Sequence, residues 1–166
     1  MDRIIDENLH NHPLKEQQEQ IAKYRNLGIG IMGLHDMFIK LNIKYGSLES
    51  IKLAENIMRL IFRNSVFTSY DLAKELGTFP GYSDKVFESS IMKEAFSSDE
   101  LEKMKKFGLR NCSLLSIAPT GSISTMLGVS GGLEPLFMKK FQRKTVSLNK
   151  EEKVYDVYAK IVKEYL

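Results

Sequence analysis

The chain has 166 residues, of which 43% are hydrophobic and 27% are charged, a globular composition that argues against a disordered or low-complexity protein. No apolar run approaches the roughly 18 residues that span a bilayer, and the polar N-terminus lacks the apolar core of a signal peptide, so we expect a cytoplasmic protein and no membrane association. The net charge of +3 comes from lysines and glutamates that are mixed along the chain, which favours a solvated surface over a nucleic-acid-binding patch.

The first quarter of the chain predicts two helices separated by an apolar segment. Residues 14–24 have helical spacing of their apolar positions, and Pro13 suits a first turn. Residues 26–34 form an apolar run interrupted by glycines, which we expect to be a buried strand. Helical spacing then returns at residues 34–42.

Residues 48–76 are expected to form one long helix, because Ser47 can cap its start and Gly77 fits its end. The expected apolar stripe of this helix consists of Leu48, Ile51, Ile57, Met58, Ile61, Tyr70, Ala73 and Leu76.

The region after the long helix predicts a turn at residues 78–84 and two shorter helices, near residues 84–95 and 98–107. The second of these helices opens at Ser97 or Ser98, and acidic residues in its first turn favour that start.

The last third of the chain alternates short apolar segments with turns. Residues 111–118 resemble a short strand, residues 136–145 are strand-like, and residues 150–166 have helical spacing. Helices therefore dominate, with a few apolar strands between them, and this mixture favours an α/β fold over an all-α fold.

Residues 28–33 spell G-x-G-x-x-G, a pattern that is typical of dinucleotide-binding turns. Such a turn requires a clear strand before the first glycine and an acidic residue about twenty positions later, at a strand end. Polar residues precede Gly28, and the acidic residues at that spacing belong to the long helix. We therefore favour a packing role for the three glycines, with nicotinamide or flavin binding as the weaker alternative.

A loop that could bind an anion follows the strand-like segment. It consists of Pro119, Thr120, Gly121, Ser122, Ile123 and Ser124. Its amides and hydroxyls could converge on an anion, aided by a helix that begins near Ser124. No lysine follows as in a P-loop, so this is not a Walker site. From the residues alone, an anion site and a plain turn with a serine cap are equally favoured.

Residues 130–135, Ser-Gly-Gly-Leu-Glu-Pro, suggest a constrained loop that presents the carboxylate of Glu134. This group could orient a ligand hydroxyl or act as an acid or base. The residues alone favour the alternative, in which Glu134 caps backbone amides of the turn.

The single cysteine, Cys112, excludes an intrachain disulfide and a multi-cysteine metal site. It has no paired base nearby in sequence, so we expect a small buried side chain. His10, His12 and His35 lack metal-ligand spacing, and we expect them to be structural or solvated, with no metal site.

Four segments taken together resemble the catalytic chains of ribonucleotide reductases. They are RNLGIGIMGLHD at residues 25–36, LAKELGTFP at residues 72–80, RNCSLLSIAPTGSIS at residues 110–124 and SGGLEP at residues 130–135. They follow the order and spacing of that family over roughly residues 1–145, and their sequences are most similar to those of the adenosylcobalamin-dependent type.

The resemblance implies that the chain is a helix-rich, partial segment of a ten-stranded α/β barrel. In that family, thiyl-radical chemistry replaces the ribose 2′-hydroxyl with hydrogen, and the loop matching Pro119–Ser124 binds the substrate phosphates. This favours the anion site over the plain turn, and a packing role for Gly28–Gly33. The loop with Glu134 lies near the substrate in the family, and we carry over no catalytic role for it.

The departures from the family pattern concern its cysteines. The family's catalytic loop reads Asn-x-Cys-x-Glu, whereas Asn111 and Cys112 are adjacent and no glutamate follows. The dithiol and the tail cysteines of the family are also missing, so the isolated chain is expected to be inactive. We expect residues 1–166 to be a single segment of the barrel domain, incomplete at both ends.

The resemblance implies a ribonucleoside di- or triphosphate as substrate and adenosylcobalamin as cofactor of a full-length member, with no cofactor bound to this chain alone. The expected partner is the remaining portion of the reductase chain, and a dimer is a further option. The alternative is a non-catalytic interaction module or split subunit, whose exposed apolar faces bind a complementary polypeptide.

Overall fold

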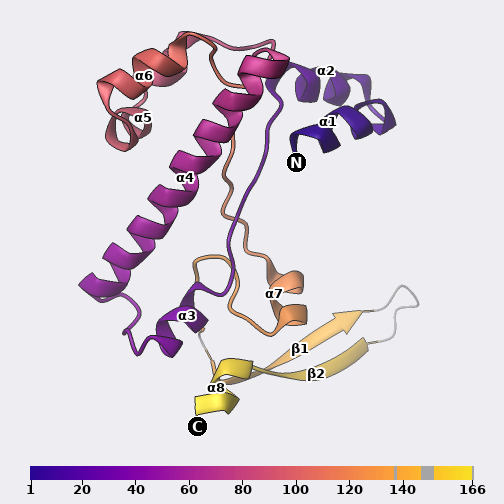
Figure 1. Cartoon of the computed structure of the whole chain (residues 1–166). Coiled ribbons are helices and arrows are strands. Elements are labelled where there is room, and N and C mark those ends of the chain that lie inside the picture. The colour runs from indigo at the N-terminus through magenta and orange to yellow at the C-terminus, as the bar shows by residue number, and fades with distance from the viewer. Residues whose placement is uncertain (137, 147–151, 166) are drawn as a thin grey trace. The chain divides into compact units, whose positions relative to one another are not determined.

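The computed structural model describes residues 1–136, 138–146 and 152–165, and helices dominate them (Figure 1). In chain order the elements are α1 (Asp2–Asn8), the 3-10 helix η1 (Leu9–Asn11), α2 (Lys15–Tyr24), α3 (Leu34–Lys40), α4 (Leu48–Leu76), the 3-10 helix η2 (Asp84–Glu88), α5 (Ser90–Ala95), α6 (Ser98–Lys105), α7 (Gly121–Leu127), β1 (Lys140–Val146), β2 (Glu152–Tyr158) and α8 (Lys160–Tyr165).

The chain divides into two compact units. Unit 1 comprises Met1–Ile29 and Glu55–Ser116, and unit 2 comprises Gly30–Ala54 and Ile117–Leu166. The described residues form a two-stranded antiparallel sheet, β1 with β2, and no barrel. No helix among them is long and apolar enough to cross a membrane.

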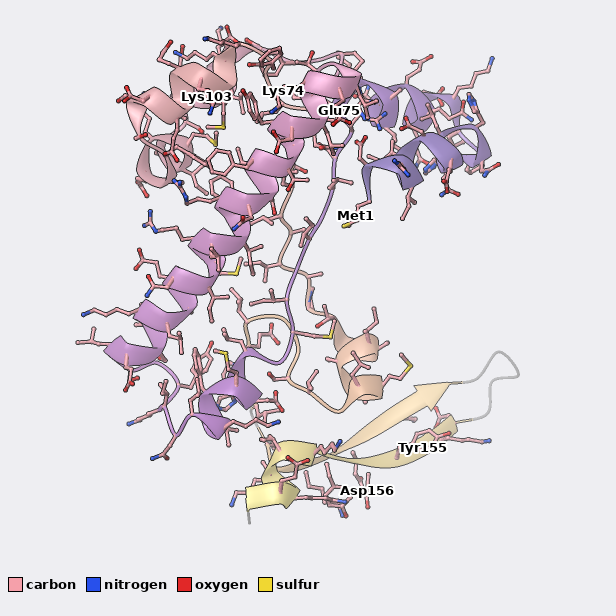
Figure 2. All side chains as sticks on the ribbon, viewed as in Figure 1. Met1, Lys74, Glu75, Lys103, Tyr155 and Asp156 are labelled. Carbon is pink, nitrogen blue, oxygen red and sulfur yellow. The ribbon has the colours of Figure 1, made fainter. Side chains whose placement is uncertain are left out.

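The main hydrophobic core lies in unit 1, where the second half of α4 packs with α5 and α6. Its buried members are Val66, Tyr70, Phe79, Phe87, Met92, Ala95, Phe96, Met104 and Leu109. Figure 2 shows side chains filling the space between this half of α4 and the two short helices. Burial of these aromatic and aliphatic groups is the principal stabilising contribution to unit 1.

The predicted stripe of α4 is correct at Tyr70 and Ala73 and wrong at the two ends of the helix. Tyr70 and Ala73 are buried as predicted, whereas Leu48 is 78% exposed, and Ile51 and Leu76 are also exposed. Helical spacing defines a face, but only the neighbouring elements determine whether that face is covered. Elements of unit 1 cover the second half of α4.

The predicted helix caps are confirmed. At the start of α4, Ser47 Oγ accepts a hydrogen bond from the Ser50 amide at 3.2 Å. At its end, Gly77 has a φ of +79° and its amide donates to the Ala73 carbonyl at 2.9 Å. Ser97, rather than Ser98, caps α6 in a reciprocal capping box with Glu100.

A buried polar network joins distant parts of unit 1. The Asp2 carboxylate lies 2.9 Å from Arg25 Nη2 and 3.3 Å from Arg110 Nε, and it accepts a hydrogen bond from Asn111 Nδ2 at 2.8 Å. Burial alone would raise the pKa of Asp2, but the hydrogen bonds from Arg25 and Asn111 lower it below the usual value. The network therefore ties α1 to the segments that follow α2 and α6.

The predicted strands at residues 26–34 and 111–118 are not formed as regular strands. They pair through a parallel bridge between Ile29 and Leu115, with hydrogen bonds from Ile29 N to Leu114 O and from Ser116 N to Ile29 O. The Leu27 amide also donates to the Ser113 carbonyl at 2.9 Å. A parallel strand is normally buried between further strands and covering helices. Ile29 and Leu115 are only half-buried in this chain.

The helix predicted for residues 150–166 is wrong over most of its length. Residues 152–158 form β2, which pairs with β1 from Lys140↔Tyr158 to Val146↔Glu152, and only Lys160–Tyr165 form a helix. Valines and tyrosines favour a strand once a partner strand is available. The strand predicted at residues 136–145 is confirmed from Lys140 onward. Residues 137, 150, 151 and 166 of these two predictions lie outside the described residues.

Candidate functional site

The predicted anion loop leads directly into α7 in unit 2. Thr120 precedes the helix with a φ of +51°, and the helix runs from Gly121 to Leu127 before Gly128 ends it with a φ of +71°. The helix therefore begins three residues earlier than the predicted start near Ser124. This places the amides of residues 121–123 in the first turn of the helix.

The loop of residues 130–135 packs closely on the anion loop. The amide of Gly132 donates to Thr120 Oγ1 at 3.0 Å. A Cβ added to Gly131 would lie 2.5 Å from the Pro119 carbonyl oxygen, so the two backbones approach more closely than any side chain at this position allows. The two motifs that the sequence singled out separately thus form one structure.

Asp36 and His35, in the first turn of α3, hold the two ends of the same loop. Asp36 Oδ2 accepts a hydrogen bond from the Ser130 amide at 2.7 Å, and His35 Nδ1 accepts one from the Leu136 amide at 2.7 Å. The prediction of a structural role for His35 is confirmed. The sequence assigned no role to Asp36, although it is the final residue of the family-like segment at residues 25–36.

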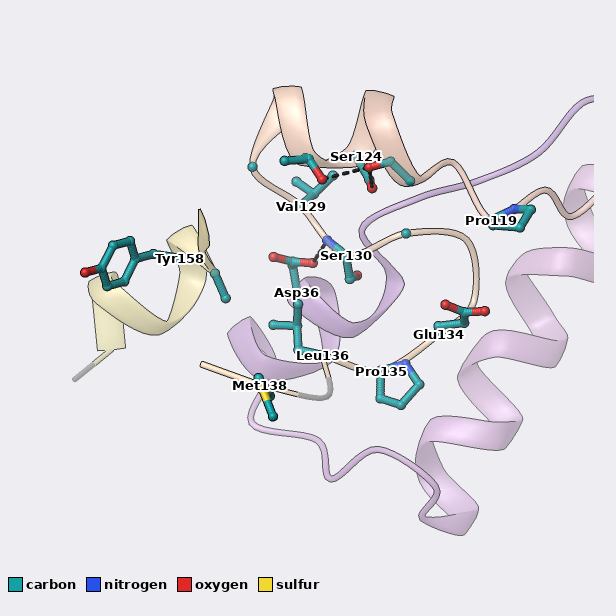
Figure 3. Close-up of a pocket in the computed structure, with 15 residues that line it drawn as sticks. Asp36, Pro119, Ser124, Val129, Ser130, Glu134, Pro135, Leu136, Met138 and Tyr158 are labelled. Carbon is teal, nitrogen blue, oxygen red and sulfur yellow. Dashed lines mark hydrogen bonds between the residues drawn. The ribbon is translucent and has the colours of Figure 1, made fainter. Parts of the chain in front are cut away.

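These elements enclose a cavity of about 300 Å³ (Figure 3). Its wall is formed by Asp36, Pro119, Gly121, Ser124, Thr125, Gly128, Val129, Ser130, Gly131, Glu134, Pro135, Leu136, Met138, Tyr158 and Ala159. A cavity of this size can accommodate part of a nucleotide-sized ligand. The cavity therefore brings Glu134 and part of the predicted phosphate loop to one place.

The six loop residues differ in how they face this cavity. Gly121 lies beside open space, because a Cβ added there would meet no atom within 4 Å. Ser122 and Ile123 are exposed and do not belong to the cavity wall. Ser124 is buried and directs both of its donors at the chain itself, its amide at the Thr120 carbonyl and its hydroxyl at the Gly121 carbonyl.

Glu134 is exposed, and it lies in the cavity wall (Figure 3). Two amides of the turn have other partners: that of Ser130 donates to Asp36 and that of Gly132 donates to Thr120. Glu134 therefore caps neither of these two amides.

Close packing at Gly28 and a left-handed backbone at Gly33 account for two glycines of the G-x-G-x-x-G segment. A Cβ added to Gly28 would lie 3.2 Å from Ser116 Cβ, which is tighter than ordinary van der Waals contact. Gly33 has a φ of +80° immediately before α3, and its amide donates to the Ser130 carbonyl at 2.8 Å. These contacts agree with the predicted packing role, although the segment is extended chain rather than a strand.

Cys112 is exposed, so the prediction of a buried side chain is wrong. Its amide is engaged with the Tyr24 carbonyl at 2.9 Å. The described residues contain no group of three or more His, Cys, Asp or Glu side chains arranged to hold a metal ion.

Comparison with known proteins agrees with the sequence resemblance. A family model described as the ribonucleotide reductase barrel domain matches residues 1–166. The ribonucleoside-diphosphate reductase subunit alpha of Chlamydia trachomatis is 30% identical over 169 aligned positions, which cover 89% of this chain and 16% of that protein. A vitamin B12-dependent ribonucleoside-diphosphate reductase of Mycobacterium tuberculosis is 34% identical over 88% of this chain and 18% of its own length.

A solved structure, that of the Actinobacillus ureae class Id ribonucleotide reductase alpha subunit, shares the fold. It matches with a TM-score of 0.63 and 24% identity, over 83% of this chain and 23% of that chain. The chain thus spans less than a quarter of the length of each of these proteins.

Proposed function

The chain belongs to the ribonucleotide reductase barrel-domain family, and from that premise we propose that it is part of a ribonucleotide reductase catalytic chain. Its contribution to that chain is the loop Pro119–Ser124, which binds the phosphates of a ribonucleoside di- or triphosphate. The complete chain, assembled with the remaining reductase polypeptide, replaces the ribose 2′-hydroxyl with hydrogen. Glu134 lies near the substrate in this assembly.

The observation that carries this proposal is the open space beside Gly121 at the start of α7, where the cavity meets the helix. Amides in a first helical turn point toward the N-terminal end and carry partial positive charge, which favours an anion. Ser124 directs its amide and hydroxyl inward, so in this proposal the phosphates meet the loop at Gly121, which lies in the cavity wall. Thr120 and Ser124 then support the loop.

Replacing Gly121 tests the phosphate assignment in the chain assembled with the remaining reductase polypeptide. Gly121→Asp places a carboxylate at the phosphate position while remaining compatible with a helix start, so we expect affinity for pyrophosphate and for a ribonucleoside diphosphate to fall at least tenfold. Gly121→Ala is the matched control, because its methyl group enters open space and should change affinity only a few-fold. Isothermal titration calorimetry measures both. Equal affinities for the wild type and Gly121→Asp would remove the phosphate assignment.

The residues that the structure describes do not by themselves fit adenosylcobalamin. The cavity of about 300 Å³ is much smaller than a corrin ring with its axial groups. Relatives from Mycobacterium tuberculosis and Thermoplasma acidophilum are named vitamin B12-dependent reductases. In our proposal, the cofactor therefore belongs to the complete reductase, as do the cysteines that carry the radical and supply the electrons.

A second candidate function is that of an interaction module that binds a complementary polypeptide. The apolar side chains of Ile123, Met126 and Leu127 recur at helical spacing on α7 and are exposed, Met126 by 79%, while the same helix buries the polar Ser124. A helix on a protein surface normally buries its apolar side chains and exposes its polar ones. Size-exclusion chromatography distinguishes the cases, since a monomer that stays soluble at high concentration would argue against such an exposed binding face.

A further inference from the structure

Asp36 occupies an unusual position for a charged side chain. It is only 8% exposed, yet its carboxylate forms part of the cavity wall (Figure 3). One carboxylate oxygen, Oδ2, accepts the hydrogen bond from the Ser130 amide at 2.7 Å. A neutral asparagine could accept that same bond without the cost of a buried charge, so the tether to Ser130 does not by itself account for a carboxylate here.

The described wall of the cavity carries negative charge. Among the described residues of its wall, the charged side chains are the carboxylates of Asp36 and Glu134. A phosphate beside the buried Asp36 carboxylate would be repelled. A ligand whose phosphates lie at residues 119–124 therefore meets Asp36 with hydrogen-bond donors rather than with phosphates.

We propose that Asp36 is a binding residue for the non-phosphate end of the nucleotide. Its Oδ1 accepts a hydrogen bond from an O–H or N–H group of the ligand, while Oδ2 keeps the bond from Ser130. This inference rests on the proposed function, because it takes the ligand's phosphates to lie at residues 119–124. The donor is either a sugar hydroxyl or an N–H of the base, and the carboxylate recognises the same chemistry in both.

Asp36→Asn tests this assignment with little change in shape. The amide oxygen of asparagine still accepts from Ser130, but an NH₂ group replaces the acceptor that faces the cavity. In the chain assembled with the remaining reductase polypeptide, affinity for a ribonucleoside diphosphate should fall about tenfold or more, as expected for a lost hydrogen bond to a charged group. Affinity for pyrophosphate should stay equal or rise, because a nearby negative charge has been removed.

The affinity for ribose 5-phosphate identifies which group of the nucleotide donates to Asp36. If its affinity also falls in Asp36→Asn, the donor is a sugar hydroxyl, and if only the nucleotide responds, the donor is on the base. Either result supports the proposal. Asp71→Asn, an exposed site on α4 with the same change of charge, serves as the control and should leave all three affinities unchanged.

Two results would overturn the binding role of Asp36 and leave the proposed function intact. One is an unchanged nucleotide affinity in Asp36→Asn. The other is an equal loss of affinity for pyrophosphate, which would indicate that Asp36 only supports the loop. A wild-type chain that binds neither pyrophosphate nor the nucleotide would overturn the proposed function as well. Should Asp36→Asn fail to fold, carboxyl ¹³C NMR of the wild type replaces it. The Asp36 resonance should shift with the nucleotide and not with pyrophosphate, and an unchanged resonance would reject the proposal.

Discussion

The imidazole of His35 joins the start of α3 to the loop that follows α7. Its Nδ1 accepts the Leu136 amide at 2.7 Å, and its ring meets Tyr45 edge-on at 5.1 Å. Burial lowers the pKa of His35 below 6.5, although the neighbouring Asp36 carboxylate acts in the opposite direction. The folded chain therefore keeps the neutral imidazole, since a protonated Nδ1 could not accept the Leu136 hydrogen bond.

This geometry predicts a pH-dependent attachment of the loop. The stabilisation of the folded loop by His35 is complete above pH 6.5 and declines as the pH falls below that value. The reason is that the imidazole of the unfolded chain, whose pKa is higher, becomes protonated before that of the folded chain. The hydrogen-exchange protection factor of the Leu136 amide should thus decrease between pH 7.5 and 5.5. His35→Asn offers an uncharged acceptor near the Nδ1 position and should remove the decrease. A decrease that persists in this variant would assign it to another group.

At the scale of elements, α6 shows how a short helix is fixed at its start. Ser97 Oγ accepts from the Glu100 amide, and the Glu100 carboxylate accepts from the Ser97 amide at 2.8 Å. The Arg63 guanidinium, 2.6 Å away, and the Ser97 amide lower the pKa of Glu100 to about 2. The stabilisation from Glu100 is therefore present above pH 4.5 and is lost as the pH falls toward 2.

Ser97→Ala should destabilise the chain by about 1 kcal/mol, the usual cost of removing a serine N-cap. Ser98→Ala, one residue later and equally exposed, should change stability by no more than about 0.5 kcal/mol, because Ser98 lies inside the helix. Urea denaturation at neutral pH measures both free energies of unfolding. Equal losses in the two variants would contradict the assignment of Ser97 as the cap.

At the scale of the whole molecule, the chain is a family segment that divides into two units. The match to the barrel-domain model extends over residues 1–166, yet the chain spans 16% to 18% of the curated relatives compared above. The described residues form no barrel, and exposed apolar side chains occur on α4 and α7. These features agree with a partial segment of the family.

The isolated chain should not reduce ribonucleotides. Its single cysteine cannot both carry a radical and supply the two electrons of a dithiol. An assay of ribonucleoside di- and triphosphates with adenosylcobalamin and dithiothreitol should show no deoxyribonucleotide, and addition of the remaining reductase polypeptide should restore turnover. Deoxyribonucleotide formed by the isolated chain would refute this expectation.

Much of the helical structure follows from short stretches of sequence. The bounds of α4 and the cap of α6 depend on hydrogen bonds between residues at most four positions apart, so serines and glycines predict them directly. The motif at residues 119–124 and the loop containing Glu134 were also evident from residue types. By contrast, residues 152–158 form a strand instead of the expected helix, because β1 supplies a partner 6 to 18 positions away in the chain.

The sequence by itself determined the family, the long helix and the identity of the candidate phosphate loop. Only the tertiary structure decided that Asp36 lines the cavity, that Cys112 is exposed and that Asp2 joins Arg25 and Asn111 in a buried network. The physical reason is range. A cap or a helical face is set by neighbours within one or two turns. Burial and side-chain pairing instead depend on segments 23 to 109 residues apart, whose approach no local pattern records.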